Sequence, residues 1–311
     1  MIRRATAESI AIAVDILRSG GLVAVPTETV YGLAADATNA AAVRRIFTVK
    51  DRPPGHPLIV HIGRSAPLDR WCGDVSVDAR KLAAAFWPGP LTMIVPSIDA
   101  IATEVTGGRA TVGLRMPDHP LTLDLLDAFD GAVAAPSANR FGKVSPTTAA
   151  HVERDLDGEV DLILDGGPCR VGVESTIVEL VGPVPQILRL GAITAAQIAA
   201  VLGREVLPEP VGPARASGML ASHYAPSCAV HIVEDRDEAM ALVAELWNRG
   251  EGPVDLLDPE ATSDEWAHEL YGWLREADER RLRSLVVVPP SSDGVGAAVR
   301  DRLAKAAAPR P

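Results

Sequence analysis

Cationic side chains recur at the ends of apolar segments, where they could hold a phosphate group. Lys50 and Arg52 stand in K-D-R-P-P-G-H-P, a loop stiffened by prolines between a helix-like stretch and an apolar run. Lysine offers a point charge and arginine a planar fork of donors, so the pair suits phosphate. The simpler alternative is a solvated helix end, where cations are favoured in any case.

Two arginines close apolar runs that are typical of buried strands. Arg115 ends T-V-G-L-R and Arg189 ends Q-I-L-R. A buried arginine is costly without an anion, so Arg115 favours a carboxylate or phosphate ligand. Asp118 offers an alternative within the chain, because an ion pair with it would satisfy Arg115 without any ligand.

Three further segments place hydroxyl groups beside apolar runs: P-T-E-T-V-Y-G-L (26–33), A-A-P-S-A-N-R-F-G-K-V-S-P (134–146) and G-V-E-S-T-I (172–177). Each could by itself be a capped turn. Open α/β sheets bind their ligands at strand ends, however, and polar loops there often carry function. Together with Lys50, Arg52, Arg115, Lys143 and Arg189, these segments predict a pocket for a nucleotide phosphate and a small polar acid.

The elements that must position these residues alternate between strand and helix, which predicts an α/β protein. We expect helices at 6–18, 39–49, 77–86, 147–156 and 194–202. We expect strands at 22–25, 58–62, 91–95, 111–115, 132–135, 161–164, 175–180 and 186–190.

The alternation stops at 205–226, where prolines crowd into a stretch without periodicity. Proline-rich segments are extended and semi-rigid, so we interpret it as a linker between two domains. After it we expect strands at 229–233, 254–257 and 285–288 and helices at 235–248, 264–277 and 294–307. The predicted organisation is a catalytic domain at 1–205, a linker or lid at 206–226 and a smaller α/β domain at 227–311.

Composition narrows the class of protein. The chain has 311 residues, 47% hydrophobic, and a net charge of −11, which disfavours nucleic-acid binding through a basic surface. No apolar run approaches the roughly 18 residues of a membrane span, and no signal peptide is apparent. Three widely spaced cysteines lack metal-site spacing and fit a reducing cytoplasm, so we expect a cytoplasmic protein with no protein-held metal.

Several common chemistries lack their signatures. The sequence contains no G-x-x-x-x-G-K-[ST] phosphate loop, no H-E-x-x-H and no G-x-S-x-G. Gly294 and Gly296 follow an apolar run and open a helix-like stretch, but Val299 stands where a dinucleotide motif has its third glycine. An ordinary helix start explains them.

Four motifs in this order carry a family resemblance: P-T-E-T-V-Y-G-L, K-x-R-P-x-x-x-P-L, P-S-A-N and E-S-T-I. With A-V-R-D-R-L-x-K-A near the end, the chain resembles the YrdC-like threonylcarbamoyl-AMP synthases in their longer form. The resemblance implies a YrdC-like twisted, mixed open sheet with helices, followed by a smaller Rossmann-like C-terminal domain.

The resemblance also implies a reaction in which L-threonine, bicarbonate and ATP give threonylcarbamoyl-AMP, pyrophosphate and water. The product would pass to a downstream tRNA threonylcarbamoyl transferase that modifies adenosine in tRNA. We expect Mg²⁺ to be carried mainly by the ATP phosphates, since no carboxylate cluster suits an all-protein cage. Direct tRNA binding and membrane binding are not expected.

Site residues follow from the matching motifs. The resemblance implies that the threonine pocket includes Thr29, His61, Arg115, Ser175 and backbone near Ala135. It implies that ATP meets Arg52, Thr111, Ser137, Ser145 and Arg189, with Tyr224 of S-H-Y-A-P folding over the nucleotide. Lys50 and Arg52 would stabilise the charge on the leaving pyrophosphate. His56 stands where the family usually has asparagine; a histidine there could still donate to a phosphate.

Two other functions stay open at this stage. One is an RNA-binding module without nucleotidyltransferase activity, whose RNA affinity would fall steeply with salt. The other is a carbamoyl-transfer domain of the kind found inside larger maturation enzymes, although the zinc-finger and acylphosphatase-like segments of such enzymes are missing from this sequence.

Overall fold

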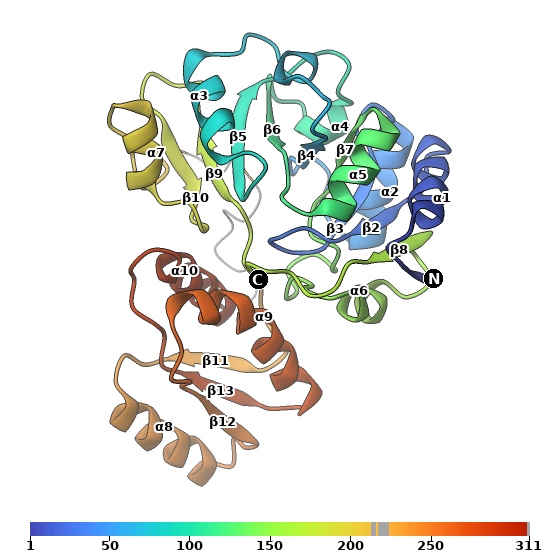
Figure 1. Cartoon of the computed structure of the whole chain (residues 1–311). Coiled ribbons are helices and arrows are strands. Elements are labelled where there is room, and N and C mark those ends of the chain that lie inside the picture. The colour runs from blue at the N-terminus through green and yellow to red at the C-terminus, as the bar shows by residue number, and fades with distance from the viewer. Residues whose placement is uncertain (213–215, 217–223, 310–311) are drawn as a thin grey trace.

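The computed structural model describes residues 1–212, 216 and 224–309, and it forms two α/β domains (Figure 1). The first part of the expected linker lies beside the first domain, where Leu207 bridges to Gln186. The greater part of 213–223 lies outside the described residues.

The first domain is built on a mixed sheet with the strand order β1-β8-β2-β3-β7-β4-β6-β5-β9-β10. The strands are β1 (Ile2–Arg4), β2 (Val23–Val25), β3 (Gly32–Asp36), β4 (Ile59–Ile62), β5 (Leu91–Pro96), β6 (Thr111–Arg115), β7 (Ala132–Ala134), β8 (Leu162–Asp165), β9 (Thr176–Glu179) and β10 (Gln186–Arg189). The helices are α1 (Ala7–Arg18), α2 (Ala40–Lys50), α3 (Val77–Phe86), α4 (Thr103–Thr106), α5 (Pro120–Phe129), α6 (Ala149–Leu156) and α7 (Ala195–Leu202), with a short 3₁₀ turn at Leu68–Arg70.

Alternating apolar residues give this sheet two buried faces. In β2, Val23 and Val25 pack with α1 and α5, whereas Ala24 faces the larger core formed with α2, α3, α6 and α7. Successive side chains of a strand point to opposite faces, so a short apolar strand can serve both cores. The sheet is therefore covered on both sides, and its ligand-binding surface is left to the strand ends.

The second domain has a parallel sheet of order β11-β13-β12, formed by β11 (Ala229–Ile232), β13 (Ser284–Val287) and β12 (Val254–Leu257). Its helices are α8 (Arg236–Asn248), α9 (Ser263–Glu279) and α10 (Gly296–Ala307). In Figure 1, α9 and α10 lie between this sheet and the first domain, while α8 covers the far face.

Helix starts follow local chemistry. Thr6, Ser76 and Thr148 each accept a hydrogen bond from an amide in the first turn of α1, α3 and α6. Asn39 and Asp235 do the same for α2 and α8. A capping side chain satisfies an amide that the helix itself leaves unpaired, which is why these boundaries could be predicted from residue type.

The expected fold class and two-domain architecture are confirmed, and the expected elements appear with small shifts at their ends. Five elements were missed: β1, β3, α4, α5 and the 3₁₀ turn at Leu68–Arg70. β3 was hidden because 26–33 was interpreted only as a polar turn. α5 had usable signals, with Pro120 in its first turn and buried leucines at 121 and 125.

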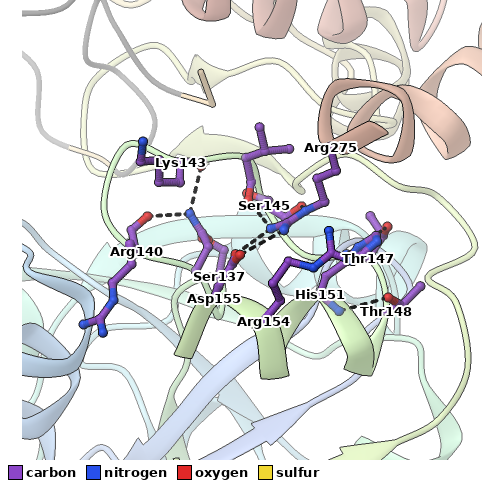
Figure 2. Close-up of polar contacts among 12 residues, drawn as sticks. Ser137, Arg140, Lys143, Ser145, Thr147, Thr148, His151, Arg154, Asp155 and Arg275 are labelled. Atoms are coloured by element: carbon purple, nitrogen blue, oxygen red, sulfur yellow. Dashed lines mark hydrogen bonds and ion pairs between the residues drawn. The ribbon is translucent and has the colours of Figure 1, made fainter. Parts of the chain in front are cut away.

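Two arginine pairs join the domains through α6 and α9, as Figure 2 shows for Arg275. Arg275 binds both carboxylate oxygens of Asp155 at 3.0 and 2.6 Å, and it also donates to the carbonyls of Val144 and Ser145. Arg154 pairs with Glu279 nearby. Arg275 is buried and Arg154 is half exposed. Loss of Arg275 would therefore leave a largely buried carboxylate without its partner, whereas loss of Arg154 would leave a carboxylate that water can reach.

Among the described residues, no helix is both long and apolar enough to cross a membrane.

Replacing Arg275 tests the domain contact. Arg275→Met leaves the Asp155 carboxylate and two carbonyls without their partner, so we expect the free energy of unfolding to fall by about 3 kcal/mol. Arg154→Met, at an exposed pair between the same helices, should cost less than about 1 kcal/mol. Urea unfolding of the two variants makes the comparison, and equal losses would contradict a buried, structural role for Arg275.

Candidate active site

A pocket opens where the ends of several strands of the first domain meet Tyr224, just before the second domain. Its wall includes three buried arginines, Arg52, Arg115 and Arg189, which come from distant parts of the chain. The described lining residues are Thr27, Thr29, Val30, Gly32, Arg52, Ile59, His61, Arg115, Ala135, Pro136, Ser137, Glu174, Arg189 and Tyr224. The structure thus brings together the predicted cations that matter most for binding an anion.

Strand register places His61 beside Arg115. The two residues are Cα partners in the parallel pair β4 and β6, so their side chains project from the same face. Burial, with the charge of Arg115 as a second cause, lowers the pKa of His61 to about 3. His61 is therefore a neutral hydrogen-bonding group at pH 7.

Arg115 already has an anionic partner within the protein, and this partner is Glu28. Its Nη2 lies 2.7 Å from Glu28 Oε1, and its Nε donates to the Gly89 carbonyl at 3.2 Å. Asp118, the alternative considered from the sequence, pairs with Arg170 instead. Proximity in sequence misled here, because the turn after β2 brings Glu28 under the end of β6.

The segment that follows β2 is a compact turn. The Thr27 hydroxyl accepts from the amides of Thr29 and Val30 and lies 2.8 Å from the Thr29 hydroxyl. This bonding holds Thr29 in the pocket wall, where it was predicted. Thr27 is a further wall residue that sequence reasoning left unassigned.

The loop after β7 closes against this turn. Leu33 donates to the Pro136 carbonyl and Ala138 to the Tyr31 carbonyl. A Cβ at Gly32 would lie 3.3 Å from the Ala135 Cβ, so glycine allows the close approach. Ala135 and Ser137 consequently line the pocket, as predicted.

Lys50, a predicted catalytic residue, is not among the described residues that line the pocket. Its ammonium donates to the carbonyls of Ser137 and Asn139, the first at 2.6 Å, and it is 1% exposed. Burial, with Arg52 as a further cause, lowers the pKa of Lys50. In this structure Lys50 therefore holds the loop that carries Ser137, and its catalytic role stays a prediction.

Arg52 and His56 flank the ring of Phe141. The Arg52 guanidinium lies 5.4 Å from the ring centroid, and the His56 ring meets it edge-on at 5.6 Å. Arg52 lines the pocket, and burial lowers its pKa to about 10, so it stays charged at pH 7. His56 stands outside the lining, and burial together with Arg52 lowers its pKa, so at neutral pH it offers a hydrogen bond and no charge.

Ser175 supports a pocket residue instead of lining the pocket itself. Its hydroxyl accepts from Arg189 Nη2 at 3.0 Å and lies 2.7 Å from the Thr92 hydroxyl, while its carbonyl accepts from Arg189 Nε. Ser175 therefore orients Arg189, and its predicted contact with threonine stays a prediction.

Ser145 is also set behind the wall. It is fully buried, and its hydroxyl donates to Glu174 Oε1 at 2.6 Å. Glu174, not Ser145, lines the pocket. The sequence analysis did not assign Glu28 and Glu174 to the site. Both carboxylates nevertheless lie inside the motifs that carry the resemblance, P-T-E-T and G-V-E-S-T.

Thr111 opens a neighbouring groove. It lies at the start of β6, four residues before Arg115, in a groove whose wall includes Pro57, Ile94 and Ile177. Ile59 borders both this groove and the main pocket. A ligand longer than an amino acid could therefore extend from Arg115 towards Thr111.

Tyr224 ends the wall on the side of the second domain. It has a φ of 61° and is 2% exposed, and its ring stacks on that of Tyr271 with centroids 5.8 Å apart. Burial raises its pKa to about 12, so its hydroxyl is neutral. Lys143, in contrast, is exposed and, as Figure 2 shows, points away from Ser145.

His61 should make the stability of the fold depend on pH. Its pKa is about 3 when folded and about 6.5 when unfolded, so below pH 6.5 the unfolded state binds the extra proton. Stability is then lost as the pH falls from 6.5 towards 3. Between pH 6 and 4 we expect the unfolding free energy of His61→Gln to fall less steeply, by up to about 1.4 kcal/mol per pH unit.

Urea titrations at several pH values measure these slopes. His268→Gln removes a partly exposed histidine and controls for the loss of an imidazole as such. Parallel curves for the wild type and His61→Gln would show that His61 is not held neutral by the fold.

Comparison with known proteins assigns both parts of the chain. Residues 15–191 match the Sua5/YciO/YrdC family model, described as telomere recombination, and residues 193–308 match the threonylcarbamoyl-AMP synthase C-terminal domain. The second region begins before α7, although α7 packs on the core of the first domain.

Similar proteins span nearly the whole chain. A threonylcarbamoyl-AMP synthase of Bacillus subtilis is 39% identical, over 97% of this chain and 93% of its own length. One of Schizosaccharomyces pombe is 32% identical, over 95% and 87%. The crystal structure of P. abyssi Sua5 complexed with L-threonine superposes with a TM-score of 0.93 at 37% identity and covers 99% of this chain and 97% of that one. The chain therefore belongs to the Sua5/YrdC family of threonylcarbamoyl-AMP synthases, in the two-domain form.

Proposed function

We propose that the pocket lined by Arg52, Arg115 and Arg189 is where this synthase joins L-threonine, bicarbonate and ATP. The observation that carries the proposal is the convergence of three buried guanidinium groups on one pocket that also presents neutral polar groups. Buried arginines in such a wall favour anionic ligands. A substrate carboxylate and a triphosphate are both ligands of this kind.

Threonine is assigned to the end of the pocket formed by Thr29, His61 and Arg115. Arg115 is held in place by Glu28 and Gly89, so its fork is oriented before the ligand arrives. The neutral imidazole and the Thr29 hydroxyl can bond the polar groups of the amino acid without adding charge. The printed description of the P. abyssi structure, a complex with L-threonine, supports this substrate.

ATP is assigned to the end that contains Arg52, Ser137 and Arg189, with Tyr224 covering it. Arg52 and Arg189 would stabilise the negative charge that grows on the phosphoryl oxygens as pyrophosphate leaves. We propose that the remainder of the nucleotide extends along the groove at Thr111, which shares Ile59 with the pocket.

The reaction takes place between the threonine end and the ATP end of the pocket. The threonine amine adds to bicarbonate, with loss of water, and a carbamate oxygen then attacks the α-phosphorus as pyrophosphate departs. Carbamates are labile in water, so a buried pocket that holds the carbamate beside the phosphorus protects it and aligns the attack. The products are threonylcarbamoyl-AMP, pyrophosphate and water, which balances the reaction.

We propose that Mg²⁺ enters as MgATP and is held by phosphate oxygens. Among the described residues, no group of three or more His, Cys, Asp or Glu could hold a metal ion. The wall carboxylate Glu174 already binds Ser145, Tyr271 and Arg302. The residues that the structure describes therefore do not fit a protein-held ion.

The product is an activated carbamoyl donor, so a transferase that accepts it and acts on tRNA must follow. We place the reaction in the cytoplasm, where ATP and tRNA are available. The acidic net charge favours release of the product to that transferase over direct tRNA binding by this chain.

Pyrophosphate release tests the reaction. With ATP, threonine and bicarbonate all present, we expect steady pyrophosphate formation, and omission of any one should reduce it to background. Release from ATP alone, at the full rate, would contradict a synthase that requires threonine. Salt-dependent RNA binding without any pyrophosphate release would instead favour an RNA-binding module.

Arg115 tests the assignment of the threonine end. The variant Glu28→Gln/Arg115→Met removes the ion pair without leaving a buried charge, so it reports on the ligand contact. We expect the KM for threonine to rise at least tenfold, since a hydrogen bond to a charged group contributes about 1.5–3 kcal/mol. The KM for ATP should change less than about threefold. Equal increases for both substrates would contradict the assignment, and Glu28→Gln alone is the matched control.

A further inference from the structure

A carboxylate stands in the wall of the pocket that we assign to ATP. Glu174 is buried and lines the pocket between the segments that carry Ser145 and Arg189. A carboxylate beside a triphosphate site repels the ligand unless a cation neutralises it. The structure therefore has to account for this charge.

The cation that binds Glu174 comes from the second domain. Arg302, on α10, is 0% exposed, and its Nε donates to Glu174 Oε2 at 2.9 Å. Its Nη2 donates to the Leu190 carbonyl at 2.8 Å, directly after the pocket residue Arg189. Tyr271 of α9 donates to the same Glu174 oxygen at 2.8 Å. Among the described residues, the second domain thus supplies two of the three side chains that donate to this carboxylate.

Asp301, Lys305 and Arg189 are other charged groups near this pair, and Glu174 still requires Arg302 as its counter-charge. Asp301 accepts from Arg302 Nη1 at 2.6 Å and from Lys305 at 2.7 Å, so it lies on the side of Arg302 away from Glu174 Oε2. Burial by itself would raise the pKa of Glu174, but Arg302 and then Arg189 lower it to about 2. Glu174 is therefore ionised at working pH and needs a counter-charge.

The wall residue Tyr224 also packs against Arg302. The Tyr224 ring lies 5.2 Å from the Arg302 guanidinium and stacks on Tyr271. Arg275 of α9 meanwhile donates to the Ser145 carbonyl, while Glu174 accepts from the Ser145 hydroxyl. Helices α9 and α10 therefore contact Glu174, Tyr224 and the segment that carries Ser145.

We propose that Arg302 is a positioning residue of the synthase reaction: by pairing with Glu174 from the C-terminal domain, it neutralises the one carboxylate found in the described pocket wall and so completes the ATP site. This inference rests on the proposed ATP assignment. The inference assigns a function to the second domain. When this domain docks, Arg302 neutralises Glu174, and the pocket wall with its three arginines can then accept a triphosphate.

Charge-removal variants of the full chain test the inference, with ATP binding measured by calorimetry and the KM values by pyrophosphate release. Arg302→Met leaves Glu174 ionised beside the phosphates, so we expect the Kd for ATP to rise about tenfold or more. The threonine KM should stay within about threefold of the wild type. Arg300→Met, which breaks the exposed pair between α10 and Glu234, is the matched control and should bind ATP like the wild type.

The decisive variant is Glu174→Gln/Arg302→Met, which removes both charges. If Arg302 acts by neutralising Glu174, the double variant should bind ATP within about threefold of the wild type and more tightly than Arg302→Met. A double variant that binds no better than Arg302→Met, or an Arg302→Met chain that binds ATP normally, would overturn the inference and leave Arg302 as a structural contact only.

Folding and function can be separated in the same experiment. If Arg302→Met does not fold, as judged by thermal unfolding, Arg302→Lys replaces it, because lysine keeps the charge but reaches fewer partners. Because lysine keeps the counter-charge to Glu174, we then expect ATP binding within about threefold of the wild type, and a tenfold loss would count against the inference. A wild-type chain that binds no ATP would instead contradict the proposed function itself.

Discussion

Every buried arginine around the pocket requires a partner, and this requirement organises the site. Arg115 is matched by Glu28, Arg189 by the carbonyl and hydroxyl of Ser175, and Arg302 by Glu174. Removing a charge from water is so costly that such groups remain buried only when their partners are fixed. The fold therefore holds cations rigidly at a place where they can also meet a ligand.

The same requirement explains why some polar residues line the pocket while others lie behind them and hold them in place. Thr29, His61 and Ser137 face the pocket, whereas Lys50 and Ser145 stand behind it. Lys50 binds the Ser137 carbonyl and Ser145 binds the Glu174 carboxylate, so these two buried residues set the positions of the loops that line the pocket. An enzyme that must shield a labile carbamate benefits from such rigidity, because water is excluded and the reacting groups are held in line.

Much of the fold could be predicted because local rules decide it. Thr6 and Asn39 cap their helices by residue type, and the apolar runs around β5 and β6 form strands almost where expected. The candidate site was predicted less completely. Asp118 is closer to Arg115 in sequence than Glu28 is, and the polarity of Lys50 and Ser145 is the same whether they face a ligand or a carbonyl. Residue type and spacing do not say which way a side chain points.

The sequence by itself determined most of the elements and the motifs that mark the family, because capping, periodicity and motif order are properties of neighbouring residues. Only the tertiary structure decided which cations share a pocket and which partners neutralise them. Strand order brings His61 beside Arg115, and domain docking brings Arg302 to Glu174 across 128 positions of chain. Electrostatic pairing acts through space, so the partners of buried charges follow from packing and not from order along the chain.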